Sequence, residues 1–151
     1  MSQAYDFAIF TDSSADLGED LVREMDIQVL PLSFTIQDRT YHNYPDNREL
    51  DPHVFYQMLR EGQTATTAAV NVEQYLQAME PQLQAGRDVL VLAFSSGLSA
   101  TYNSSSVAAD ELRDLNLFGG LGALGDHQVH PCALGFFGVA VGGLLGDLSL
   151  V

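Results

Sequence analysis

The apolar run at residues 88–94, DVLVLAF, restricts the fold more than any other segment of this chain. It is too short for a helix of ordinary length, and its unbroken branched side chains suit a strand covered on both faces. Strands of this kind belong to parallel sheets, which have helices on each side. A second short run at residues 5–10, YDFAIF, predicts another such strand that ends at Thr11. Together the two runs predict an α/β domain.

Two amphipathic segments after the first predicted strand carry helix-start signals. Asp16, three residues before Glu19, fits a capping arrangement for the first helix. Asp51 followed by Pro52 marks the start of the second helix, which Gly62 should end. The apolar positions expected to face the core are Leu17, Leu21, Val22 and Met25 in the first helix, and Val54, Phe55, Met58 and Leu59 in the second.

Two further helices are predicted before and after the strand at residues 88–94. Asn71 and Gln74 form a capping pair for the earlier one, in which Pro81 should cause a kink or a restart and Gly86 the end. The apolar positions expected to be buried are Val72, Tyr75, Leu76 and Met79 in that helix, and Tyr102, Val107, Ala108 and Leu112 in the later one.

The segment between the first two helices predicts the remaining strands. Residues 27–36 form one strand that alternates after Pro31, a residue that belongs at a strand edge or bulge. Residues 37–38 can turn the chain into a hairpin strand at 39–44. The full order of elements predicts a mostly parallel sheet with helices on both faces. Ligands of such sheets bind at the carboxyl ends of the strands.

Three clusters of hydroxyl side chains lie near predicted helix starts. Residues 11–14 (TDSS) follow the first strand, residues 95–99 (SSGLS) follow the strongest strand, and Thr64, Thr66 and Thr67 precede the helix at Asn71. Each cluster can simply cap a helix or form a turn. Hydroxyls and free amides at helix starts also suit a carboxylate or phosphate, so both interpretations stay open.

Four segments within residues 5–114 carry a family resemblance, and they are FTDSSADL at 10–17, Pro31-Leu32, Thr66-Thr67 and SSGLSATY at 95–102. In order and spacing they resemble the motifs of the DegV family of fatty-acid-binding proteins. The resemblance implies an N-terminal α/β domain, with the family's C-terminal α+β domain missing here, and a long-chain fatty acid bound between the two. It implies a binding protein without cofactor or catalysis, which presents the carboxylate to a separate fatty acid kinase.

The resemblance also implies roles for individual residues. The head-group ligands are Thr67, or its neighbour Thr66, and Ser96, or its neighbour Ser95. The residues that shape the loops are Asp12, Ser13 and Gly97. Hydroxyls can hold a carboxylate or an acyl phosphate through hydrogen bonds. Ala100 stands where the family usually has glycine, which matters only if that position needs a positive φ.

The charge balance excludes several classes of partner. The chain has 6 Arg, no Lys and 20 acidic residues, for a net charge of −14. Nucleic-acid binding needs clustered basic side chains, so neither nucleic acid nor an anionic membrane surface is an expected partner. The start of the chain, MSQAYDF, lacks the features of a signal peptide, and Cys132 has no second cysteine to pair with. A cytoplasmic location is predicted.

The composition changes at about residue 115. Residues 1–114 hold all 6 Arg and 18 of the 20 acids, whereas residues 115–151 hold 9 of the 13 Gly and only Asp126 and Asp147 as charges. We therefore divide the chain into a DegV-like domain, 1–114, and an atypical Gly-rich tail, 115–151, in which glycine disfavours a helix or strand. Our hypothesis is that the tail reflects a shifted reading frame or a truncated gene end, which would impair lipid binding.

The tail offers two further interpretations, and neither is favoured. The charge-free run 132–146 is shorter than the roughly 20 apolar residues that a membrane span needs. His127, His130 and Cys132 are three candidate zinc ligands, whereas structural zinc sites usually need four. No membrane span and no metal site are therefore predicted.

Two other functions compete with lipid binding. A small hydrolase could use Ser96 as nucleophile, or a phosphoryl-transfer enzyme could use Asp12, although neither residue has the usual partners nearby in the sequence. A nonfunctional gene fragment is the third possibility. His42 and His53 lie near the predicted hairpin and a helix start, where surface roles are expected.

Overall fold

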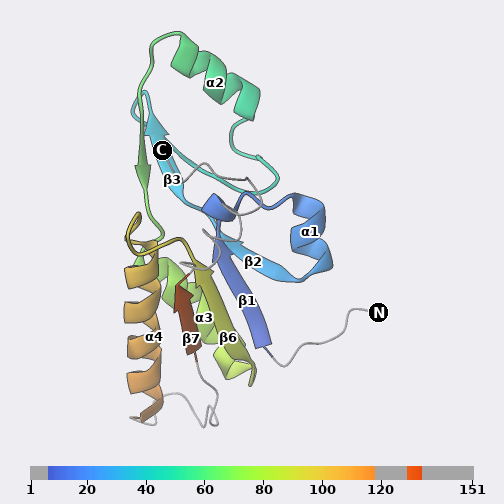
Figure 1. Cartoon of the computed structure of the whole chain (residues 1–151), viewed down its shortest axis with the longest axis vertical. Helices are drawn as coiled ribbons and strands as arrows, with labels where there is room; N and C mark the ends of the chain where they lie inside the picture. The colour runs from blue at the N-terminus through green and yellow to red at the C-terminus, as the bar shows by residue number, and fades with distance from the viewer. Residues whose placement is uncertain (1–6, 118–128, 134–151) are drawn as a thin grey trace, which may run out of the picture.

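The computed structural model describes residues 7–117 and 129–133, which form two lobes (Figure 1). The larger lobe contains a four-stranded sheet, and the smaller lobe contains a three-stranded sheet and projects from one end of the larger one. The predicted α/β architecture is therefore present, with an additional small sheet that the sequence patterns did not predict.

The larger sheet is parallel throughout. Its strands are β1 (Phe7–Asp12), β2 (Ile27–Leu30), β6 (Asp88–Ala93) and β7 (Val129–Ala133), in the order β2-β1-β6-β7. The strongest predicted strand is confirmed as β6. The first strand continues to Asp12 rather than ending at Thr11, because its pairing with β2 extends to that residue.

Strand β7 overturns the expectation that the Gly-rich segment after residue 114 would hold no strand. It pairs in parallel with β6, with Val129 opposite Val89 and Ala133 opposite Ala93. The sheet edge at β6 supplies hydrogen-bond partners that a local composition argument does not consider. Pro131 is compatible with this place, because β7 is the outermost of the described strands and proline is tolerated at an edge.

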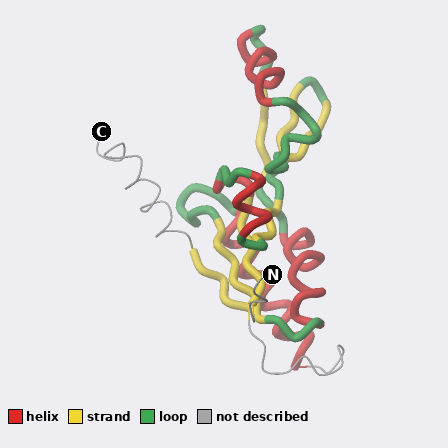
Figure 2. The backbone as a smooth tube through the Cα atoms, turned by 90° about the vertical axis from the view of Figure 1, so that its right-hand side faces the viewer, coloured by secondary structure: helices red, strands yellow, loops and turns green. Residues whose placement is uncertain are grey.

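The hydrophobic core lies on the face of the sheet that packs against α3 (Val72–Gln84) and α4 (Thr101–Leu117), which Figure 2 shows side by side. Its buried members are Ala8, Phe10, Val89, Val91 and Ala93 from the strands, Val70 from the segment before α3, and Tyr75, Met79, Leu83, Ala108, Ala109 and Leu112 from the helices. On the opposite face, α1 (Glu19–Glu24) leaves an apolar cavity of about 170 Å³ above Ile9 and Leu92. The prediction of helices on both faces is confirmed, but the two faces are covered unequally.

The first helix differs from its prediction. A short 3-10 turn at Ser13–Ala15 follows β1, and Asp16 ends that turn in the left-handed conformation, with φ 50°. The cap of α1 is Gly18, so the proposed Asp16 cap is wrong. The reason is that Asp12 already caps the 3-10 turn and delays the helix. The helix buries no side chain, and Leu21 and Met25 are 45% and 40% exposed.

Helix α3 begins as predicted and ends as predicted. The Asn71 side chain accepts from the Gln74 N–H at 2.9 Å, and the Gln74 side chain accepts from the Asn71 N–H at 3.0 Å. The predicted restart at Pro81 is wrong, because the helix continues to Gln84. A single missing N–H bond is tolerated in a helix whose Tyr75, Met79 and Leu83 are buried. Gly86, with φ 77°, follows its end.

Helix α4 also follows the prediction for most of its core positions. Ala108 and Leu112 are buried, and Tyr102 packs against the core. Val107 is 46% exposed instead of buried, and Ala109 takes its place in the core. The buried face of α4 therefore includes Ala109 and excludes Val107, in contrast to the predicted face.

The smaller sheet has the order β4-β3-β5, with β3 (Ser33–Ile36), β4 (Arg39–His42) and β5 (Ala65–Ala68). The single strand predicted at 27–36 is wrong, because the chain leaves the larger sheet at Pro31 and enters the smaller one at Ser33. The predicted hairpin is confirmed. Gln37 and Asp38 both have positive φ, 51° and 61°, as the tight turns that join right-twisted strands require.

Two of the three clustered threonines lie within β5 instead of at a helix start. Thr66 and Thr67 pair with Thr35 and Phe34 of β3, so the capping or turn interpretation of these two residues is wrong. A four-residue antiparallel edge strand is specified by its partner β3, and its own sequence carries little signal.

Helix α2 (Pro52–Arg60) joins β4 to β5 at the tip of the smaller lobe (Figure 1). It begins as predicted, since the Asp51 carboxylate accepts from the His53 N–H at 2.7 Å, and Gly62 ends it with φ 89°. Its predicted buried face is wrong: Val54 is 47% exposed, and Phe55, Met58 and Leu59 are only partly buried. The described part of the chain does not cover this face fully.

Candidate functional site

A cavity of about 420 Å³ lies where the loop after β1 meets the smaller lobe. This volume falls within the range of about 300–1,000 Å³ that is typical of small-molecule sites. Its apolar walls come from Leu32, Phe34, Leu50, Pro52, Phe55 and Tyr56. Its polar lining comes from Ser13, Ser14, Asp16, Ser33, Asn43, Asn47 and Thr67. A molecule that has both an apolar part and a polar group matches this lining.

The strand register separates the two candidate head-group threonines. Thr67 lies opposite Phe34, and Thr66 lies opposite Thr35, so their side chains point to opposite faces of the smaller sheet. Thr67 lines the cavity and shares its sheet face with the Phe34 ring. That ring packs edge-on against the Phe55 ring, with the two ring centres 5.1 Å apart. Thr66 faces the other side. The geometry therefore favours Thr67.

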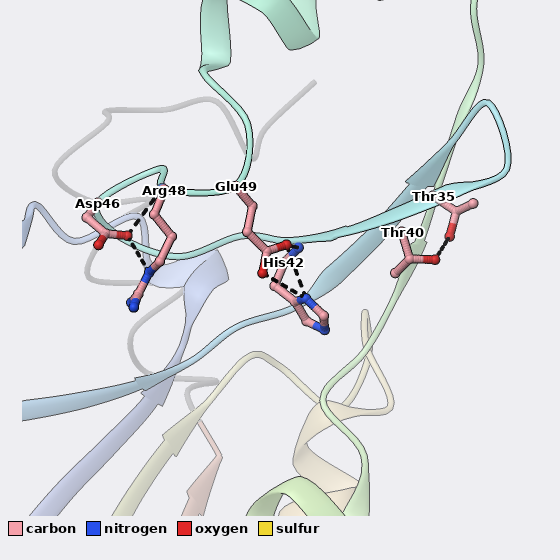
Figure 3. Close-up of polar contacts among 6 residues, drawn as sticks. All are labelled: Thr35, Thr40, His42, Asp46, Arg48 and Glu49. Carbon is pink, nitrogen blue, oxygen red and sulfur yellow. Dashed lines mark hydrogen bonds and ion pairs between the residues drawn. The ribbon is translucent and has the colours of Figure 1, made fainter.

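The face that carries Thr66 also holds a bonded pair of threonines. Thr35 is opposite Thr40 in the hairpin, and their hydroxyl oxygens lie 2.9 Å apart (Figure 3). Thr40, Thr35 and Thr66 lie opposite one another across the three strands and form a row on one face of the smaller sheet. None of the three lines the cavity.

Asp12 and Ser13 connect the loop after β1 to two neighbouring segments. Asp12 is 1% exposed, and one carboxylate oxygen accepts from the N–H of Ser14, at 2.9 Å, and from its hydroxyl. The other oxygen accepts from the Phe94 N–H at 2.7 Å, at the end of β6. Ser13 Oγ accepts from the Leu32 N–H at 3.0 Å. With both its oxygens bonded inside the protein, Asp12 is poorly placed to accept a phosphoryl group.

The serine loop after β6 is folded on itself. Ser95 Oγ accepts from the Gly97 N–H at 3.3 Å, and the Ser95 carbonyl oxygen accepts from the N–H groups of Leu98 and Ser99, both at 3.0 Å. Ser95 is partly buried and Ser96 is exposed. Neither serine lines the 420 Å³ cavity. The structure thus brings Thr67, Ser13 and Ser14 to one cavity and leaves Ser95 and Ser96 on the neighbouring loop.

Two positions that the family motif associates with glycine need no special backbone conformation here. A Cβ on Gly97 would find Ser95 Oγ at 3.8 Å, which is ordinary contact, and the φ of Gly97 is not in the left-handed region. Ala100 is likewise outside the left-handed region. The alanine that departs from the family pattern therefore causes no backbone strain.

Tyr75 places a neutral hydroxyl in the core beneath these loops. Its side chain is fully buried, and its hydroxyl has no hydrogen-bond partner among the described residues. Burial, assisted by the Asp12 carboxylate, raises the pKa of Tyr75 above its usual value near 10. The sequence pattern identified Tyr75 as a core residue and carried no signal of this electrostatic coupling.

One wall of the cavity has no counterpart among the sequence motifs. Asn43, Asn47 and Leu50 come from the loop between β4 and α2, and Phe55 and Tyr56 come from α2. Of these five residues, the sequence pattern points only to Phe55, as part of a buried helix face. The loop residues form a wall only after the chain folds back across β3, so no local signal could have identified them.

Other candidate sites find no support within the described residues. No three or more His, Cys, Asp or Glu side chains gather there as a metal site. His127 lies outside those residues, and the side chains of His130 and Cys132 are not described, so the zinc interpretation falls outside the description. None of the helices at 7–117 is long and apolar enough to cross a membrane. Most of the run 132–146 lies outside the description as well.

A match to a protein family covers most of the chain. A family model described as "Uncharacterised protein, DegV family" matches residues 6–121. The chain belongs to the DegV family. This match confirms the resemblance seen in the loop motifs, and it reaches past residue 114.

Curated DegV relatives are considerably longer than this chain. It is 45% identical over 106 residues to a DegV domain-containing protein of Clostridium perfringens, and 35% identical over 104 residues to one of Lactococcus lactis. These alignments cover 70% and 69% of this chain, but 36% of each relative. The chain spans about a third of the length of these relatives.

Solved DegV structures share the fold. A Thermus thermophilus DegV protein, described as fatty-acid binding, aligns with 95% of this chain and 49% of its own, at 25% identity and a TM-score of 0.68. A Thermotoga maritima protein described as revealing a fatty-acid-binding function aligns with 82% of this chain and 41% of its own, at 29% identity and a TM-score of 0.62. These matches confirm the α/β fold with its parallel sheet.

Proposed function

We propose that this chain binds a long-chain fatty acid, with the acyl chain in the 420 Å³ cavity and the carboxylate at Thr67. The observation that carries the proposal is the position of Thr67, which places a hydroxyl in the cavity on the same sheet face as the apolar Phe34 ring. The descriptions of the Thermus and Thermotoga relatives support the choice of ligand. Since the chain spans only part of those proteins, the complete pocket of the family is not implied for it.

The head-group end of this site is built from neutral hydroxyls. Thr67 and Ser13 line the cavity and can donate to a ligand, whereas the single hydroxyl proton of Ser14 is already donated to Asp12. Ser95 and Ser96 follow the strand whose end is tied to Asp12. Hydroxyl donors hold a carboxylate without a formal counter-charge, which suits a ligand that must be released. We include Ser96 and Ser95 as the second pair of head-group residues, which the ligand would reach from the adjoining loop.

The proposed activity is carriage and not catalysis. No hydrogen bond joins Ser96 to a histidine within the described residues, and His42 is bonded to Glu49 instead. The arrangement therefore offers no activated nucleophile of the Ser–His type. We propose that the carrier works in the cytoplasm without a cofactor and presents its carboxylate to a separate fatty acid kinase. The experiment below also distinguishes two other hypotheses, a hydrolase that uses Ser96 and a nonfunctional gene fragment.

Native mass spectrometry of lipids that co-purify with the 151-residue chain tests this function. We expect a bound long-chain fatty acid in the parent chain, and about tenfold weaker binding after Thr67→Ala, as expected when a hydrogen bond to a charged group is lost. Thr66→Ala is the matched control, because the same change on the opposite sheet face should leave binding unaltered.

The alternative results identify the competing functions. Absence of fatty acid from a folded parent chain, together with no binding of added palmitate, would favour a nonfunctional fragment. Equal loss of binding in Thr66→Ala and Thr67→Ala would contradict the head-group assignment. Hydrolysis of an acyl ester that stops in Ser96→Ala would favour the enzyme.

A further inference from the structure

The loop at residues 43–51 joins β4 to α2 and contributes to two walls of the cavity. Asn43, Asn47 and Leu50 line the cavity directly. The loop also sets the start of α2, where Asp51 caps the helix that carries Phe55 and Tyr56 into the same cavity. The position of this loop therefore determines much of the cavity's shape.

Most hydrogen bonds within the loop are local and do not attach it to the sheet. The Asn47 N–H donates to the Tyr44 carbonyl oxygen at 2.9 Å, and Asp46 accepts from the Arg48 side chain at 2.9 Å. The Arg48 guanidinium also lies over the Tyr44 ring, 4.0 Å from its centre. These contacts shape the middle of the loop, and other contacts must hold its ends.

The two ends of the loop are attached to the smaller sheet. At the first end, the Asn43 N–H donates to the Leu32 carbonyl oxygen at 2.8 Å. At the second end, Glu49 reaches back to His42, the last residue of β4 (Figure 3). One Glu49 oxygen accepts from the His42 N–H at 2.6 Å, and both oxygens lie 3.2–3.3 Å from His42 Nδ1. A carboxylate only accepts, so a hydrogen bond at these distances requires the proton on Nδ1.

We propose that Glu49 is a positioning residue for the cavity, because its carboxylate fastens loop 43–51 and the start of α2 to the end of β4. The strand β4 is an edge strand of the smaller sheet, and Glu49 satisfies an N–H group that this edge leaves open. One side chain thus closes the loop into a ring whose inner residues line the cavity. The effect on ligand affinity, but not the fastening itself, rests on the proposed fatty-acid function.

The charged groups around Glu49 give this contact a defined pH dependence. The His42 N–H that donates to the carboxylate lowers the pKa of Glu49, the His42 ring and Arg48 lower it further, and partial burial opposes them. A lowered pKa means that the contact stabilises the fold above the ordinary value near 4.5 and is lost as the pH falls through the lowered value. Asp46 and Asp51 are the other acids of the loop, and Tyr44 faces His42 with ring centres 5.9 Å apart.

Hydrogen exchange and palmitate binding on the 151-residue chain test the proposal together. In Glu49→Ala we expect the rate of amide hydrogen exchange across residues 43–51 to rise about threefold. We expect the Kd for palmitate to rise by a similar factor, which is the size expected for a partly exposed contact. Glu61→Ala is the matched control, since Glu61 lies at the far end of α2 and accepts only from Gln57 among the described side chains. Far-UV circular dichroism verifies that each variant is folded.

The variant Glu49→Gln distinguishes the hydrogen-bond acceptor of this side chain from its negative charge. Its amide oxygen can still accept from the His42 N–H, so we expect an intermediate effect at neutral pH. In the parent chain, protection of loop 43–51 should fall on acidification from about pH 6 to pH 3, and in Glu49→Gln this part of the profile should flatten. Loss of a structural contact alone would not remove a pH dependence.

The outcomes distinguish this proposal from the proposed function. Unchanged exchange in Glu49→Ala overturns the positioning role, and so does faster exchange with an unchanged palmitate Kd. If the parent chain binds no palmitate, the fatty-acid function fails, and the exchange comparison alone decides whether Glu49 fastens the loop.

Discussion

The two lobes bury their apolar side chains to different extents. In the larger lobe, Phe10, Val91 and Met79 are fully buried between the parallel sheet and its helices, whereas α2 of the smaller lobe buries none of its side chains. The smaller lobe has Ile36 and Tyr41 as its buried apolar residues. The cavity lies where these lobes meet, so one side is the loop after β1, which joins the buried core, and the other is the less buried α2 with its loop. Stability and ligand shape are therefore expected to depend on different residues.

The largest expected effect is on the core of the larger lobe. Phe10→Ala should lower the free energy of unfolding by about 3–5 kcal/mol, because it removes a fully buried ring. Phe55→Ala is the matched change in the smaller lobe, where partial exposure should limit the loss to about 1 kcal/mol. Urea unfolding monitored by circular dichroism gives both values. Equal losses would contradict the division between a supporting lobe and a ligand-shaping lobe.

The next effect concerns the buried hydroxyl beneath the loops. Because the fold raises the pKa of Tyr75 above 10, the folded chain favours the neutral phenol. The stability from this group is fully present below about pH 10 and falls as the pH rises further, by about 1 kcal/mol for each pH unit. Thermal unfolding between pH 8 and pH 11 should show a smaller alkaline loss in Tyr75→Phe than in the parent chain. Parallel pH profiles would show that the hydroxyl is exposed to water.

The smallest effect compares one glycine from each lobe. Gly62 has φ 89° at the end of α2, so Gly62→Ala should cost about 1 kcal/mol through strain in the left-handed region. Gly97 follows β6 with an ordinary φ and space for a Cβ, so Gly97→Ala should change stability by less than about 0.5 kcal/mol. Differential scanning calorimetry of the two variants measures which substitution lowers stability more. A larger loss for Gly97→Ala would mean that the serine loop needs a backbone conformation other than the one described.

The sequence predicted the elements that depend on local signals. The branched run of β6, the reciprocal caps at Asn71 and Gln74, and the Asp51-Pro52 helix start all appear as expected. The loop motifs led to the DegV family, which the family match confirms. The division at residue 114, the shifted-frame origin of the tail and the head-group roles of Thr67 and Ser96 stay predictions.

The errors occurred where a segment depends on a partner distant in the sequence. The strand β5 forms because β3 pairs with it, and β7 forms because β6 offers an edge. Periodicity predicts core positions for Val107 and for the apolar face of α2, because it identifies an apolar stripe without showing what covers it.

What the sequence determined by itself is the presence of β1, β6, α3 and α4 in the larger lobe, since hydrophobic runs, caps and turn residues act within a few positions of one another. Tertiary structure decided which threonine enters the cavity, because a strand alternates its faces and only the pairing of β5 with β3 assigns Thr67 to one of them. It also decided that Glu49 meets His42, seven residues away across a loop that no local pattern specifies.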